Sequence, residues 1–135
     1  MSYWLVGVGG MAGAMMRYGV GLMLPLANDG QFPYSTLLVN WSGSFLLACL
    51  LQLTAGSSKR GEALRQLIGT GLIGAYTTFS AFSADTLRLL QAGVWPTALL
   101  YAGGTLLGGL LLAWLGDLSG RSIMARRADR QGGRA

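Results

Sequence analysis

Histidine is absent from this sequence of 135 residues, and cysteine occurs only once, as Cys49. Without histidine or a second cysteine, one chain can form neither a disulfide framework nor a Cys/His metal site. The same shortage excludes a Ser-His-Asp triad and a Cys-His nucleophile pair. The five acidic residues include no close pair that suggests acid–base catalysis. The sequence therefore indicates a protein that is not an enzyme and has no catalytic residues.

Charged residues are scarce as well. They make up 11% of the chain, whereas hydrophobic residues make up 52%. A soluble domain contains roughly 25% charged residues, and a protein of this size needs them to cover its surface. The composition therefore predicts an integral membrane protein, with the lipid bilayer as its solvent and room for a single domain.

Four apolar runs divide the sequence, at about residues 3–26, 34–55, 62–91 and 95–115. The second run contains 22 residues without a charge. As a helix it would rise about 33 Å, enough for a hydrocarbon core of about 30 Å. We therefore expect an all-α membrane protein of four transmembrane helices. They form one domain over residues 1–120, and residues 121–135 form a basic tail that we expect to be disordered.

The basic residues are concentrated at one end of the chain. The last fifteen residues contain five of the ten, namely Arg121, Arg126, Arg127, Arg130 and Arg134. A basic segment directly after a hydrophobic helix favours contact with anionic lipid headgroups, and no nucleic acid is expected as a partner. With four spans, one side of the membrane carries eight basic residues, namely these five with Lys59, Arg60 and Arg65. The other side carries two, Arg17 and Arg88. This asymmetry predicts cytoplasmic termini, although without the four distal arginines the bias is weak.

Pairs of glycines four residues apart occur in the first and last runs, as Gly9-xxx-Gly13 and Gly104-xxx-Gly108. Small residues at this spacing let two membrane helices approach closely, so we expect these glycines to lie in helix contacts. A segment beginning at Gly7 also matches the loose dinucleotide-binding pattern. That pattern needs a strand before it and alternating strands and helices after it, which this sequence does not predict.

The third run contains a segment that favours helix poorly, Gly74-Ala75-Tyr76-Thr77-Thr78, where a spanning helix would lie deepest. We expect this helix to be broken near its middle. Each free peptide group in hydrocarbon costs several kcal/mol, so the break must be buried in protein or line a polar cavity. The carbonyl groups of Gly74 and Thr77, at a helix end, could hold a cation. A kink stabilised by hydroxyl groups, without a ligand, is the alternative.

Phe79 and Phe82 follow the break three residues apart, so they share one face of the next half-helix, with Ser83 beside them. Aromatic pairs at this spacing usually serve packing in a membrane helix. The edge of an aromatic ring carries positive electrostatic density, however, and can meet a small anion without trapping it. Both interpretations stay open from the residues alone.

Further polar residues lie within the apolar runs. Asn40 lies mid-span in a helix without charge, where its amide either bonds a neighbouring helix or donates to a permeating anion. Arg17 is either a functional residue that faces an aqueous cavity or a side chain that reaches back to the interface. Asp85 and Arg88, three residues apart, favour a local ion pair.

Three blocks of the sequence together resemble the Fluc/CrcB family of fluoride channels. They are residues 9–18 (GGMAGAMMRY), 36–45 (TLLVNWSGSF) and 71–83 (GLIGAYTTFSAFS). The blocks occur in the order that the family has, and the likeness covers about residues 3–117.

The resemblance implies a passive, fluoride-selective channel in a bacterial inner membrane. It implies an antiparallel (dual-topology) homodimer with two pores along the dimer interface. The residues that it implies along the fluoride path are Asn40, Phe79, Phe82, Ser83, Tyr101 and Thr105. Arg17 is implied near a vestibule, and a structural sodium ion at the dimer interface is implied between the backbone carbonyls of Gly74 and Thr77 of both subunits. The turn after Thr105 presents Gly109, so the polar track is expected to be short.

A dimer is also favoured by geometry, because four helices of this length pack around a filled centre without space for a pore. Two other functions stay open. A small proton-coupled drug exporter of four helices would need a membrane-embedded carboxylate, and Asp85 lies near the end of its run. A membrane assembly subunit that transports nothing is the remaining candidate.

Overall fold

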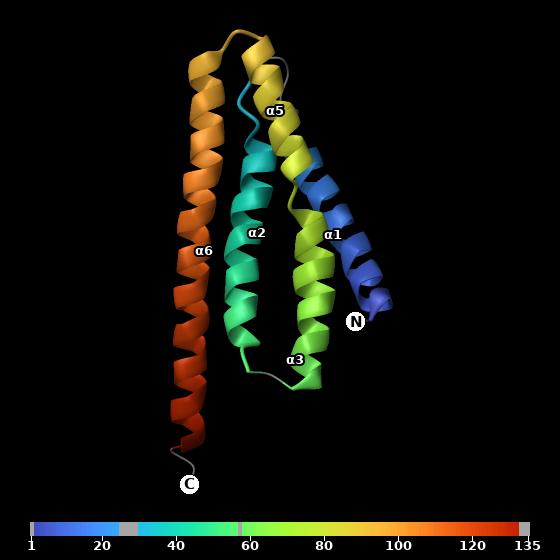
Figure 1. Cartoon of the computed structure of the whole chain (residues 1–135), viewed down its shortest axis with the longest axis vertical. Helices are drawn as coiled ribbons and strands as arrows, with labels where there is room; N and C mark the ends of the chain where they lie inside the picture. Colours follow the sequence, from blue (N-terminus) through green and yellow to red (C-terminus); the bar gives the residue numbers. More distant parts are fainter. Residues whose placement is uncertain (1, 25–29, 57, 133–135) are drawn as a thin grey trace.

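The computed structural model describes residues 2–24, 30–56 and 58–132, with side chains to residue 127, and every regular element in them is helical. The chain makes four passes along the molecule (Figure 1). The first, second and fourth are α1 (Tyr3–Met23), α2 (Tyr34–Leu53) and α6 (Trp95–Gly132). The third comprises α3 (Lys59–Leu64), the π-helix η1 (Arg65–Ile73), α4 (Gly74–Tyr76) and α5 (Phe79–Gln91). The predicted all-helical fold with a broken third helix is confirmed.

The four passes lie in an open row, with α6 and α1 at its two edges (Figure 1). α2 packs mainly against α6, η1 packs against α1 and α2, and α5 meets α6 at one end. The buried core is small and centres on Leu89, Ala98 and Tyr101, where α5 meets α6. The open row replaces the filled centre expected from the sequence. Most large apolar side chains therefore face outward, as they do on surfaces that meet lipid or another protein.

Among the described residues, two helices are long and apolar enough to cross a membrane, namely α2 and the part of α6 from Trp95 to Arg127. The third pass is divided into shorter pieces, and α1 contains Arg17 and several glycines, which lower its mean hydropathy. On α6, Trp95 and Trp114 are both exposed, and they lie about 28 Å apart along the helix axis. This spacing matches a hydrocarbon core of about 30 Å with a tryptophan at each boundary.

Glycines bring α1 into backbone contact with η1. A Cβ atom added at Gly9 or Gly13 would lie 2.0 Å from a carbonyl oxygen of η1, so no larger residue fits there. The first predicted glycine pair therefore lies in a helix contact. In the second pair, Gly108 lies against the ring of Trp41, and the carbonyl of Gly104 accepts a hydrogen bond from Trp41 Nε1 at 3.2 Å, although a Cβ atom at Gly104 would meet nothing within 4 Å.

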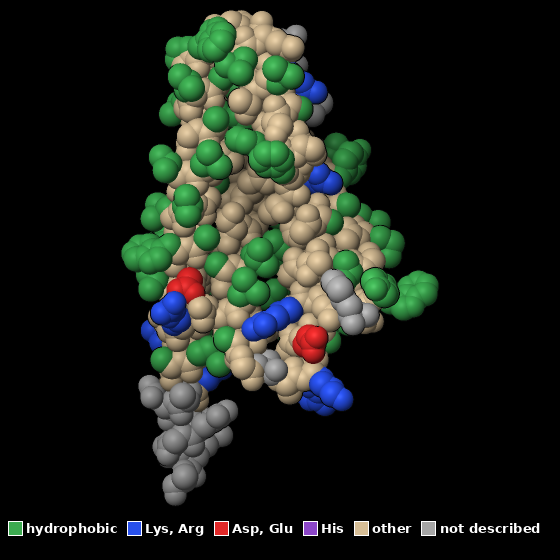
Figure 2. All heavy atoms as spheres, viewed as in Figure 1, with side chains coloured by type: hydrophobic (Ala, Val, Ile, Leu, Met, Phe, Trp, Pro, Cys, Tyr) green, Lys and Arg blue, Asp and Glu red, His purple; other side chains and the backbone are tan. Residues whose placement is uncertain are grey.

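The sequence predicts disorder from residue 121, but α6 continues as a helix to Gly132. Residues 121–130 contain neither glycine nor proline, and their arginine, alanine and methionine favour helix. The ion pair between Asp117 and Arg121, at 2.8 Å and a spacing of four residues, supports the helix across this boundary. Figure 2 shows that most Lys and Arg side chains of this face gather around this end of the molecule.

Candidate functional site

The third pass breaks between α4 and α5, at Thr77 and Thr78. Both residues have extended backbones, with ψ angles of 158° and 121°. The Thr78 hydroxyl accepts a hydrogen bond from the amide of Ala81 at 3.1 Å and so caps the start of α5. The amide and the hydroxyl of Thr77 both donate to the Ile73 carbonyl, each at 2.9 Å. The predicted break is therefore confirmed, and threonine hydroxyl groups stabilise both of its edges.

Asn40 of α2 satisfies the peptide groups that the break frees. Its side-chain nitrogen donates to the Thr78 carbonyl at 3.0 Å, and the Thr78 amide donates to its Oδ1 at 2.8 Å. The Asn40 amide thus takes the place that a neighbouring peptide would have. Of the two predicted uses of this residue, bonding to another helical segment is confirmed. The second N–H of its amide takes no part in these two bonds.

The same bonds redirect two amides away from the carbonyls predicted to hold a cation. In a continuous helix, the amides of Thr78 and Ala81 would donate to the carbonyls of Gly74 and Thr77. Here they donate to the Asn40 side chain and to the Thr78 hydroxyl. The two carbonyls lie at the end of a half-helix, where the helix dipole is negative, and their oxygens suit a cation such as sodium.

A hollow of about 490 Å³ lies beside the break, between α6 on one side and α2 with the third pass on the other. The recess is visible along the middle of the molecule in Figure 2. Its walls are mostly apolar, and none of the residues that line it is charged. Among its lining residues are Asn40, Gly74, Thr77, Phe79, Phe82 and Thr105. Most residues of the predicted path and both predicted cation ligands therefore come together.

Phe79 and Phe82 lie on one face of α5, as predicted, with ring centroids 5.8 Å apart and planes tilted by 41°. Phe82 is half-buried, and its centroid lies 5.6 Å from that of Tyr101. Phe79 is 78% exposed. Phe82 therefore contributes to the core of the chain, whereas the edge of the Phe79 ring is open to a further partner.

Two hydroxyl groups of the predicted path donate to their own helices. Thr105 donates to the Tyr101 carbonyl at 2.7 Å, and Ser83 donates to the Phe79 carbonyl at 3.0 Å. Either group must exchange this bond before it can serve an anion. Ser83 is exposed. Neither Ser83 nor Tyr101 lines the hollow.

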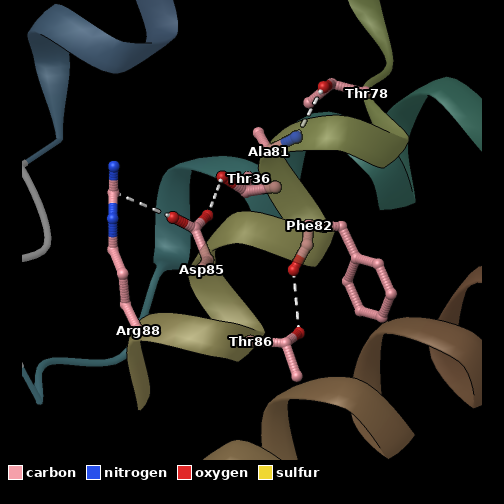
Figure 3. A network of polar contacts seen from close by, with 7 residues as sticks. All are labelled: Thr36, Thr78, Ala81, Phe82, Asp85, Thr86 and Arg88. Atoms are coloured by element: carbon pink, nitrogen blue, oxygen red, sulfur yellow. Dashed lines mark hydrogen bonds and ion pairs between the residues drawn. The ribbon is translucent and has the colours of Figure 1, made fainter. Parts of the chain in front are cut away.

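A polar network joins α2 to α5 (Figure 3). The Thr36 hydroxyl donates to one oxygen of Asp85 at 2.7 Å, and Arg88 Nη1 lies 3.4 Å from the other. The predicted local pair is confirmed. Tyr101 is fully buried near this network, and its hydroxyl has no hydrogen-bond partner among the described residues. A buried donor without an acceptor is costly, so this hydroxyl would gain from any partner that it can reach.

Arg17 lies in the last third of α1 and is half-buried. Within the described part of the chain it forms no ion pair. It does not line the hollow, so the structure keeps it apart from the other predicted residues.

Sequence reasoning missed two residues that support this site. Thr78 was predicted only as part of the break, although a threonine three residues before Ala81 at the start of a helix is a recognisable capping signal. Thr36 lies 49 residues from Asp85, and no local pattern predicts their bond.

Residues 4–117 match the family described as CrcB-like protein, camphor resistance (CrcB). Known relatives carry the name fluoride-specific ion channel FluC or FluC 2. The protein from Thermus thermophilus is 45% identical over 122 residues, which cover 90% of this chain and 95% of that protein. The one from Listeria monocytogenes is 42% identical over 132 residues, covering 98% and 100%. The one from Geobacillus kaustophilus is 41% identical over 116 residues, covering 86% and 90%.

Proposed function

This chain belongs to the CrcB family, and we propose that it is a passive, fluoride-selective channel. It releases fluoride from a bacterial cytoplasm across the inner membrane, which it crosses several times. It is a channel and not an enzyme, in keeping with the name that its relatives share. Its partners are fluoride, the lipid bilayer and a second copy of the same chain.

The hollow beside the break carries this proposal. It gathers aromatic rings, a side-chain amide and a hydroxyl group from three helices, with mostly apolar walls and no charged residue. A full positive charge at this depth would hold fluoride tightly, because Coulomb energies rise as the dielectric constant falls. Conduction needs binding that is weak enough to release the ion, and neutral donors provide it.

In the proposed path, fluoride exchanges its water molecules for protein groups in stages. The ring edges of Phe79 and Phe82 meet the ion in the hollow. The spare N–H of Asn40 and the hydroxyl of Thr105 donate to it there. The proximity of these four residues around one hollow supports this assignment.

Three other residues take part at the ends of the path. The Tyr101 hydroxyl, buried without a partner among the described residues, supplies a donor next to Phe82. Ser83 adds a second hydroxyl on α5. Arg17 lies near a vestibule, where its charge concentrates anions without binding them in the pore.

A second copy is proposed to cover the hollow. Lipid cannot satisfy the polar groups at the break, and each unsatisfied group in hydrocarbon costs several kcal/mol. The exposed ring of Phe79 and the open row of helices support a contact with protein. In an antiparallel (dual-topology) homodimer, each subunit contributes one hollow, which gives two pores along the interface.

The same arrangement accounts for a structural sodium ion at the dimer interface. The carbonyls of Gly74 and Thr77 from both subunits would hold it, and the amides redirected at the break support this assignment. When bound, the ion would neutralise the facing helix ends.

To test the antiparallel arrangement, a cysteine is placed at the C-terminus of a Cys49→Ser variant. We expect impermeant reagents to label it from both sides, and labelling from one side alone contradicts the arrangement.

Fluoride efflux from liposomes tests the function. Purified protein is reconstituted, the liposomes are loaded with fluoride, and release is followed with a fluoride electrode. We expect efflux down the electrochemical gradient without ATP or a pH gradient. No efflux, in liposomes where a control channel is active, would rule out the channel. A flux that requires a pH gradient and is abolished by Asp85→Asn would favour the drug exporter, and a silent protein with a co-purifying partner would favour the assembly subunit.

A further inference from the structure

The hollow leads toward a group of charged residues at the C-terminal side of the membrane. Its lining on α6 extends from Thr105 to Ala113. Asp117 follows Ala113 by four residues, so it lies on the same face of the helix, about 6 Å further along the axis. It also lies just beyond Trp114, at the membrane boundary. The first charged side chain on α6 beyond the hollow is therefore a carboxylate.

Two side chains hold this carboxylate in place. The amide of Gln52, near the end of α2, donates to Asp117 Oδ1. Arg121 Nε lies 2.8 Å from Asp117 Oδ2. The side chain of Asp117 is 26% exposed, whereas that of Arg121 is 66% exposed. The carboxylate is thus fixed between two helices, and the guanidinium group extends from it toward solvent.

A carboxylate at this position would by itself oppose an anion channel, because negative charge near a path lowers the local concentration of anions. Arg121 cancels this charge. A guanidinium group has five N–H donors, and only one of them is used in this ion pair. The contribution of an exposed pair of this kind to stability is small, so stability alone explains it poorly.

We propose that Gln52, Asp117 and Arg121 form an anion-receiving site at this mouth of the path. Arg121 attracts fluoride from solution, and Asp117 is a positioning residue that, with Gln52, orients the guanidinium group. The Asp117 charge offsets that of Arg121, so the site attracts fluoride without retaining it. This inference rests on the proposed channel function.

Fluoride efflux from liposomes at two ionic strengths tests the inference. Removing one charge about 10 Å from the path changes the local anion concentration about two- to threefold at about 10 mM salt and little at about 300 mM, where screening is strong. We expect Arg121→Gln to slow efflux by this factor at low salt only. Asp117→Asn leaves the Arg121 charge without a counter-charge and should accelerate efflux by a similar factor at low salt. The double variant, which lacks the guanidinium group, should be slower than the wild type at low salt.

Arg126→Gln is the matched control, because it removes the same charge from an exposed position five residues further along α6. It should change efflux by less than about 1.5-fold at either ionic strength. Gel filtration of each variant shows whether it folds. If Arg121→Gln does not fold, the salt-dependent acceleration of efflux by Asp117→Asn tests the inference by itself. Unchanged efflux in the variants, slowing that persists at high salt, or equal slowing by Arg126→Gln overturns the inference while the channel function stands. A wild type that conducts no fluoride overturns both.

Discussion

Replacing Asn40 by alanine tests whether this side chain holds the break together. The substitution removes the bonds to the amide and the carbonyl of Thr78, a residue that is 9% exposed. An orphaned buried polar group costs about 1–3 kcal/mol, although bonds between membrane helices average only about 0.6 kcal/mol. With two groups orphaned, we expect the free energy of unfolding to fall by about 2–4 kcal/mol.

Denaturation in mixed detergent, followed by tryptophan fluorescence, measures this loss. Ser44→Ala is the matched control, because Ser44 lies one turn from Asn40 on α2 and lines the same hollow. Its hydroxyl donates to the Asn40 carbonyl of its own helix at 2.8 Å and bonds no other segment among the described residues. The control should change the free energy of unfolding by less than about 0.5 kcal/mol.

Equal stability of the two variants would refute the reasoning, since Asn40 would then give the break no support. Asn40→Asp separates the two bonds. It keeps an acceptor for the Thr78 amide but turns a second acceptor oxygen toward the Thr78 carbonyl. We expect this variant to be no more stable than Asn40→Ala, because a charge buried there costs more than the remaining bond returns.

Three further substitutions probe the packing and the path. Gly13→Ala should lower the free energy of unfolding by about 2 kcal/mol or more, because its methyl group meets a carbonyl of η1. Gly7→Ala is the control and should be neutral or stabilising, because a Cβ atom there meets nothing within 4 Å. A similar loss of stability in both variants would show that the backbone contact between α1 and η1 is absent. Phe82→Ile should suppress fluoride efflux while the oligomer on gel filtration is unchanged, and wild-type efflux would mean that the ring serves packing alone. Tyr101→Phe removes a buried hydroxyl without a partner among the described residues, so the free energy of unfolding should rise by about 1 kcal/mol or more. Efflux should fall about tenfold, and unchanged efflux would exclude the hydroxyl from the path.

Features that depend on local chemistry could be predicted from the sequence. Two adjacent threonines at membrane depth disfavour helix because their β-branched side chains lose rotamer freedom there, and their hydroxyl groups bond the backbone instead. The break at Thr77 and Thr78 follows from this. Asp85 and Arg88 meet because three residues separate them on one helix.

Contacts between the passes could not be predicted in the same way. Asn40 and Thr78 are 38 residues apart, and neither neighbourhood determines the register that brings them together. The π-helix η1 likewise has no signal in its own sequence. It lies where α1 makes backbone contact through Gly9 and Gly13, which are distant in the sequence. α6 extends beyond the predicted boundary at residue 120 because the helix propensity of the residues that follow outweighs the repulsion between their arginines.

Donors that are already bonded favour conduction over tight binding at this site. Thr105 donates to a carbonyl of its own helix at 2.7 Å, and Asn40 uses one N–H on Thr78. If fluoride recruits the Thr105 hydroxyl, it replaces an existing bond, so the gain is the difference between two bonds, of order 1 kcal/mol. A ring edge adds a similarly small attraction. The Tyr101 hydroxyl, without a partner among the described residues, and the spare N–H of Asn40 would each gain a whole bond. A hollow with all its donors free would retain the ion, whereas this bonding pattern lets it pass.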